Sequence, residues 1–180
     1  MIDLASLTHH LFPIRGWSCN AVITKLGELE FEVSERQPGV ITLTNGAGLA
    51  QVHYSDLRVE AIYIVVQDSR ECERTHNAGP EFERRFFDLA LTLERQWGRP
   101  IFIGPKSHAR FPRLLAASWA AVWPAGRACV ALIEVGDPAA DAHVLGVVVM
   151  PPQPWASLTA PRYDVAAAAA AALPEIAARA

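Results

Sequence analysis

PEFERRFFDLALTLERQWGRP, residues 80–100, decides the fold of this chain, because it carries the clearest helical pattern in the sequence. Pro80 stands where a helix can begin, and Gly98 with Pro100 ends it after Trp97. Between these limits, apolar residues recur at intervals of three and four, as in a helix that lies on a sheet. This stripe consists of Phe82, Phe86, Ala90, Leu93 and Trp97. The pattern predicts a helix over 80–97 that covers one face of a sheet.

The residues before this helix have the pattern of strands. In LGELEFEVSE, at 26–35, apolar and acidic residues alternate, which predicts a strand with one apolar and one acidic face. QPG at 37–39 predicts a turn into a second strand, and NG at 45–46 is a strong hairpin signal. After a connection at 56–58, the run VEAIYIVVQ is typical of a central strand. We therefore expect an antiparallel meander ahead of the helix.

The residues after the helix predict a second meander. IFIG at 101–104 is compatible with a short strand. SWAAVWPAGRACVALIEV at 118–135 predicts a hairpin with its turn at 124–126, and HVLGVVVM at 143–150 predicts a buried strand. Strands thus come in runs instead of alternating with helices, which is typical of the α+β class.

These elements predict a single α+β domain over residues 1–180, with a largely antiparallel sheet of two meanders. The 80–97 helix is expected across one face of one continuous sheet. A short N-terminal helix is expected over 3–11, and an alanine-rich C-terminal helix is expected after Asp164, which can cap it. A chain of 180 residues is of a size that suits one domain.

Charge and cysteine content argue against several classes of protein. A net charge of −3, with two lysines and scattered arginines, argues against a nucleic-acid partner. The three cysteines are far apart in sequence and fit reduced thiols better than a disulfide framework. The N-terminus has no signal-peptide pattern, and no apolar run is long enough to span a bilayer. We expect a cytoplasmic protein with no membrane partner, as a monomer or a homodimer.

The loop SRECERTHNAGPEF, at 69–82, contains the sharpest candidate catalytic pair, Cys72 and His76. A cysteine nucleophile needs a base within reach and an electropositive setting that favours the thiolate. Glu71 and Glu73 flank Cys72, and their negative charges disfavour the thiolate. The interpretation of this segment as a charged connecting loop is therefore preferred to an active site.

No established catalytic signature accompanies that loop. GxSxG, GxxxxGK[ST], HExxH and CxxC are all missing from the sequence. The six histidines have no metal-ligand spacing, so we predict neither a metal nor another cofactor. We also predict no catalytic residue, and a small enzyme that combines the Cys72/His76 loop with His53 or His108 remains an alternative.

Acidic residues of two segments are candidate partner-binding residues. The first set lies in the predicted strand at 26–35 and consists of Glu28, Glu30, Glu32 and Glu35. The second set lies in or beside the polar loop and consists of Asp68, Glu71 and Glu73. A negative patch of this kind steers the approach of a basic partner. The same charges also suit a solvated sheet face or a protected edge strand, and both interpretations stay open.

Three patterns carry a family resemblance: FERRFFDLALTLERQWGRP at 82–100, the Trp-containing hairpin at 118–135 and HVLGVVVMP at 143–151. In this order they resemble small α+β immunity proteins of bacterial polymorphic toxin systems. The resemblance spans about residues 14–152 and carries over no catalytic residues. It implies stoichiometric binding to a cognate toxin domain, for which an acidic strand would be suited if that domain is basic.

The order of elements alone is similar to that of dimeric chaperones of specialised secretion systems, which are also small, acidic and cytoplasmic. We therefore predict a non-catalytic protein that binds another protein. An immunity protein is the preferred interpretation, and a secretion chaperone is the alternative.

Overall fold

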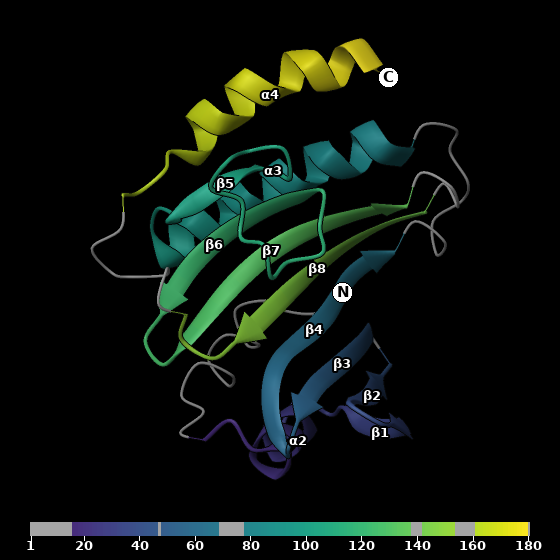
Figure 1. Cartoon of the computed structure of the whole chain (residues 1–180). Coiled ribbons are helices and arrows are strands. Elements are labelled where there is room, and N and C mark those ends of the chain that lie inside the picture. The colour runs from purple at the N-terminus through teal and green to yellow at the C-terminus, as the bar shows by residue number, and fades with distance from the viewer. Residues whose placement is uncertain (1–15, 47, 69–77, 138–141, 154–160, 180) are drawn as a thin grey trace.

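The computed structural model describes residues 16–46, 48–68, 78–137, 142–153 and 161–179, and its centre is one eight-stranded antiparallel sheet (Figure 1). The strands are β1 (Glu32–Gln37), β2 (Val40–Asn45), β3 (Gly48–Ser55), β4 (Arg58–Asp68), β5 (Phe102–Pro105), β6 (Trp119–Ala125), β7 (Ala128–Asp137) and β8 (Ala142–Met150). The helices are α2 (Cys19–Gly27), α3 (Ala78–Trp97) and α4 (Val165–Arg179). The α+β class and the single continuous sheet are confirmed, whereas the helix expected over 3–11 lies outside the described residues.

The sheet consists of two units that share one layout, in which a helix precedes a four-stranded meander. The strand order is β1-β2-β3-β4-β8-β7-β6-β5, so the last strands of the two meanders are neighbours in the middle. They pair antiparallel, from Ile62 opposite Val149 to Asp68 opposite Val144. The first strands, β1 and β5, consequently form the two opposite edges of the sheet.

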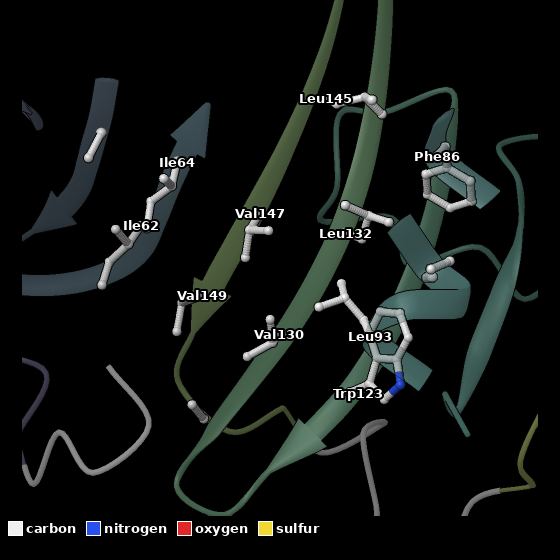
Figure 2. Close-up of a cluster of buried hydrophobic side chains, with 14 of the residues drawn as sticks. Ile62, Ile64, Phe86, Leu93, Trp123, Val130, Leu132, Leu145, Val147 and Val149 are labelled. Atoms are coloured by element: carbon white, nitrogen blue, oxygen red, sulfur yellow. The ribbon is translucent and has the colours of Figure 1, made fainter. Parts of the chain in front are cut away.

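Helix α3 covers the inner face of the sheet, as its apolar stripe predicts. Phe86 and Leu93 point from α3 toward Trp123 and Leu132 of the second meander, within a cluster that continues to β4 (Figure 2). The indole Nε1 of Trp123 donates a hydrogen bond to the carbonyl oxygen of Gly98 at 2.7 Å, which ties the end of α3 to β6. Gly98 has a φ of +75°. This left-handed conformation favours glycine at a helix end.

Helix α2 corrects the prediction of a strand over 26–35. Ser18 caps this helix, and its hydroxyl accepts a hydrogen bond from the Ala21 amide at 3.3 Å. Serine is among the preferred residues at such a position. Val22 and Leu26 are spaced for one helix face and are fully buried beside the first meander. Because the chain turns before β1 begins at Glu32, the strand prediction is wrong for the first part of this segment.

The outer face of the sheet differs between the two meanders. One row of directly paired residues crosses all eight strands: Phe102, Val122, Ala131, Val148, Tyr63, Gln51, Thr42 and Glu35. The four residues in the second meander are buried, the next three are half-buried, and the last is exposed. Segment 106–118 supplies Phe111, Leu115 and Ala117 to the buried part. The second meander is therefore covered on both faces.

Two further local predictions have clear outcomes. Asp164 caps α4 as expected, because its Oδ1 accepts a hydrogen bond from the Ala167 amide at 2.9 Å. Val165 and Ile176 of α4 are buried, and the helix packs against α3 (Figure 1). The turn between β6 and β7 falls at 126–127 instead of 124–126, because both strands of this hairpin continue their pairing to Ala125 opposite Ala128.

Candidate functional site

The four acidic residues near the start of the chain do not share one strand face, which corrects the interpretation of 26–35 as an acidic strand. Glu28 caps the end of α2 and forms an ion pair with Lys25 at 2.8 Å. Glu30 lies in the turn with a φ of +63°. Glu32 and Glu35 alone belong to a strand, β1. The sequence pattern therefore identifies an acidic edge region but not its geometry.

A β-bulge brings Glu32 and Glu35 to the same face of β1. Residues three apart in a regular strand point to opposite faces. One extra residue between them shifts the alternation by one position, so that both point to the same face. The bulge lies between Val33 and Glu35, so Glu32 is paired with Thr44 and Glu35 with Thr42. Arg36, the basic residue of this strand, is instead paired with the buried Ile41 and so takes the inner face. The bulge thus sorts the charges of β1 by sign.

These two glutamates continue into a polar face on the outer side of the first meander. We define the polar face of the first meander as Glu32, Glu35, Thr42, Thr44 and Gln51, which the strand register places on one side. All six residues of β1 are exposed, and Gln51 is half-buried. Gln37 donates a hydrogen bond from Nε2 to Oε1 of Glu35 at 2.8 Å. This surface combines carboxylates with side chains that donate and accept hydrogen bonds.

His53 of β3 and Tyr63 of β4 lie next to Gln51, at the border of the polar face, with ring centroids 4.7 Å apart. Burial lowers the pKa of His53, and the negative charge of Glu60 opposes that change. Burial also raises the pKa of Tyr63. Desolvation thus favours the neutral forms of both rings, so the charge of this surface comes from Glu32 and Glu35.

The second predicted acidic set is placed only in part. Asp68 is the last residue of β4, where it pairs with Val144 and is 8% exposed. Such burial leaves little of this side chain for contact with a partner. Glu71 and Glu73 lie outside the described residues, as do Cys72 and His76.

A buried polar cluster under the start of α3 was not predicted from the sequence. Nδ1 of His143 lies 2.8 Å from Oε1 of Glu134, which is 1% exposed. The indole Nε1 of Trp119 donates to Oε1 of Glu83 on α3 at 3.0 Å. Burial raises the pKa of Glu134, while its hydrogen bond to His143 opposes the rise. Glu134 is the one charged residue in the apolar run CVALIEV, and that isolation is the signal by which the sequence could have identified it.

Two glycines make room for His143 in this cluster. A Cβ atom on Gly136 would lie 2.9 Å from Cε1 of His143, and one on Gly79 would lie 3.2 Å from the same atom. Gly79 belongs to α3 and Gly136 to β7, so the imidazole is enclosed between helix and sheet. Its close packing and hydrogen bonding indicate a structural role, tying the start of α3 to β7 and β8.

Metal ligation and membrane crossing have no evident site in the part of the chain that the structure describes. No group of three or more His, Cys, Asp or Glu residues there is arranged to hold a metal ion. Among the same residues, no helix has the length and apolarity needed to cross a membrane.

Comparison with protein-family models, with curated proteins and with solved structures finds no match for this chain.

Proposed function

We propose that this protein acts by binding another protein through the polar face of the first meander. The resemblance to immunity proteins suggests the finer proposal, that it neutralises a cognate bacterial toxin by stoichiometric complex formation. The observation that supports binding most is the edge strand β1, in which all six residues are exposed and both glutamates share one face.

An edge strand offers two means of recognition at once. The backbone groups on the side away from β2 can pair with an extended segment of a partner. The side chains of Glu32 and Glu35 meanwhile give a negative surface, which speeds and orients the approach of a basic partner. The bulge and the charges also keep β1 from pairing with arbitrary chains, so this edge favours a selected partner.

A catalytic function has less support among the described residues. The Glu134–His143 pair has the residue types of an acid–base site, but Glu134 is almost fully buried and hydrogen-bonded. The two cysteines described, Cys19 and Cys129, are buried, and burial raises the pKa of each thiol. These thiols are consequently poor nucleophiles.

The proposal is tested by co-expression with the product of the adjacent gene. The wild-type chain should restore growth to cells that express a toxic neighbour and should form a one-to-one complex with it. The double variant Glu32→Lys/Glu35→Lys should weaken that complex by about tenfold or more, because two favourable charges become unfavourable. The matched control, Asp88→Lys/Glu175→Lys, changes net charge equally at exposed positions on α3 and α4.

Rescue and binding that are unaffected by the β1 variant, or affected equally by the control, would contradict the proposed surface. Binding of an unfolded segment of a secreted effector by a dimer of this chain would instead assign the chaperone function. Loss of rescue on Cys72→Ala with the complex intact would point to catalysis.

A further inference from the structure

A pocket lies at the edge of the sheet opposite β1, beside the start of β5. Its volume is about 440 Å³. Residues from both sides of β5 line it: Ile101, Phe102, Ala109, Arg110, Phe111, Pro112, Arg113, Leu114 and Gln153. The described residues of this lining include two arginines and no carboxylate. This pocket therefore has the opposite charge from the acidic edge.

Aromatic side chains form the walls of this pocket and hold its shape. Phe102 of β5 meets Phe111 edge to face, with ring centroids 5.8 Å apart, and meets His108 in the same manner at 5.4 Å. Edge-to-face contact is a favoured arrangement of aromatic rings. The chain between these residues is fixed by hydrogen bonds, because the Phe111 amide donates to the His108 carbonyl oxygen at 2.9 Å. The Arg110 amide also donates to Nδ1 of His108 at 3.1 Å, so the apolar wall is formed before any ligand arrives.

Both arginines are exposed, and most of their N–H donors have no protein partner among the described residues. Arg110 donates from Nη1 to the Tyr163 hydroxyl at 3.2 Å, and its guanidinium lies 6.0 Å from the centre of that ring. A guanidinium has five N–H donors, so this contact orients Arg110 without satisfying it. Neither Arg110 nor Arg113 forms an ion pair with any residue in the described ranges. Leu114, 64% exposed, adds apolar surface at the rim.

We propose that this pocket binds a small anionic ligand that has an aromatic or aliphatic body. Its carboxylate or phosphate group would meet Arg110 and Arg113, for which planar guanidinium groups are well suited. Its apolar body would lie against Phe102 and Phe111, as in ligand sites that combine apolar walls with a few polar groups. This site is separate from the polar face of the first meander and does not depend on the function proposed there.

Calorimetric titration with matched probes tests the site. Indole-3-acetate should bind at least about tenfold more tightly than neutral indole-3-acetamide, which has nearly the same shape but no charge. Phenyl phosphate provides the phosphate arm, and its affinity relative to phenylacetate, which has the same ring, identifies the preferred head group. Arg113→Gln and Arg110→Gln should each weaken anion binding by about tenfold or more. Arg127→Gln, at the exposed β6–β7 turn, is the matched control and should leave it unchanged.

Equal binding of the acetate and the acetamide would overturn the proposal, and so would undetectable binding of both anions. An equal loss in the Arg127→Gln control would also overturn it, because binding would then depend on overall charge. Thermal unfolding of each variant, together with Arg110→Lys, separates loss of the site from loss of the fold. Arg110→Lys should restore part of the affinity, since it keeps the charge and lacks the planar fork.

Discussion

The two meanders of this protein share one layout but treat their outer faces in opposite ways. In the second meander, the row through Val122, Ala131 and Val148 is buried beneath the segment 106–118. In the first, the same row continues through Thr42 to Glu35, where it is half-buried and then exposed. Burial of apolar surface is the main stabilising term in folding. The second meander is thus stabilised by burial on both faces, whereas the first leaves part of its outer face exposed.

The largest effect should come from placing a charge at two points of that row. Val122 is fully buried. Val122→Lys should therefore cost about 4 kcal/mol or more, or prevent folding, because it puts an ammonium into an apolar site. Thr42→Lys, on the first meander beside Glu35, should change the free energy of unfolding by less than about 1 kcal/mol. Urea unfolding of both variants measures the difference, and similar losses would mean that the two outer faces are equally covered.

The contact between the meanders should be the next most sensitive site. A Cβ on Gly146 of β8 would lie 3.1 Å from the carbonyl oxygen of Ile64 on β4, a backbone atom that cannot turn aside. Gly146→Ala should therefore cost about 1–3 kcal/mol in urea unfolding, because the β4–β8 pair must shift.

The control for that substitution is Gly126→Ala, at the β6–β7 turn. It adds a methyl group in open space but at a φ of +59°. This variant therefore measures backbone strain without a steric clash. Urea unfolding that shows no loss of stability in Gly146→Ala would contradict the close contact of β4 with β8.

Thiol labelling should report a smaller difference between the halves. With Cys72→Ser as background, Cys129 of β7 should react at least about tenfold more slowly than Cys19 of α2 under native conditions. Cys129 is fully buried, and burial raises its pKa to about 12, whereas Cys19 is the first residue of a short helix. The two rates should converge in concentrated urea, which controls for intrinsic reactivity. A faster Cys129 in the native state would reverse the proposed order of stability.

The last prediction concerns the pH dependence of stability, part of which should be carried by Glu134. Because burial raises its folded-state pKa above the ordinary 4.5, its contribution to stability is fully present below the unfolded-state pKa. That contribution is lost as pH rises through the folded-state value. The stability of the wild type relative to Glu134→Gln should therefore fall with rising pH, by no more than about 1.4 kcal/mol per pH unit. Urea unfolding between about pH 4.5 and pH 8 measures this slope. Glu32→Gln, at an exposed position of β1, is the control. If the stability of the wild type relative to Glu134→Gln rises with pH, the prediction is wrong.

Local signals were sufficient to predict most of the elements of this fold. Each of these signals lies within a short stretch of sequence: the apolar stripe of α3, the turn residues of the first meander and the capping Asp164. The sequence pattern does not predict helix α2, because Val22 and Ile23 suit a strand as well as a helix, although Ser18 is a residue type that favours a helix cap. The pairing of β4 with β8 joins residues about eighty positions apart, so no local pattern specifies it.

The candidate sites were harder to derive than the fold. The sequence identified Glu32 and Glu35 as acidic, but their shared face depends on a bulge that the alternating pattern concealed. The Glu134–His143 contact and the arginine pocket each consist of residues from different strands or loops. These residues are close together only in the folded chain. Charge can therefore be predicted from the sequence here, whereas its arrangement depends on sheet register.

Hydrogen exchange of the chain in complex with the product of the adjacent gene tests most directly whether the first meander is the partner-binding half. On complex formation, amides of residues 32–45 should become protected, while those of α3 and β7 should exchange at unchanged rates. Protection confined to α3 and the second meander would contradict the proposal, as would the failure of the two proteins to form a complex at micromolar concentrations.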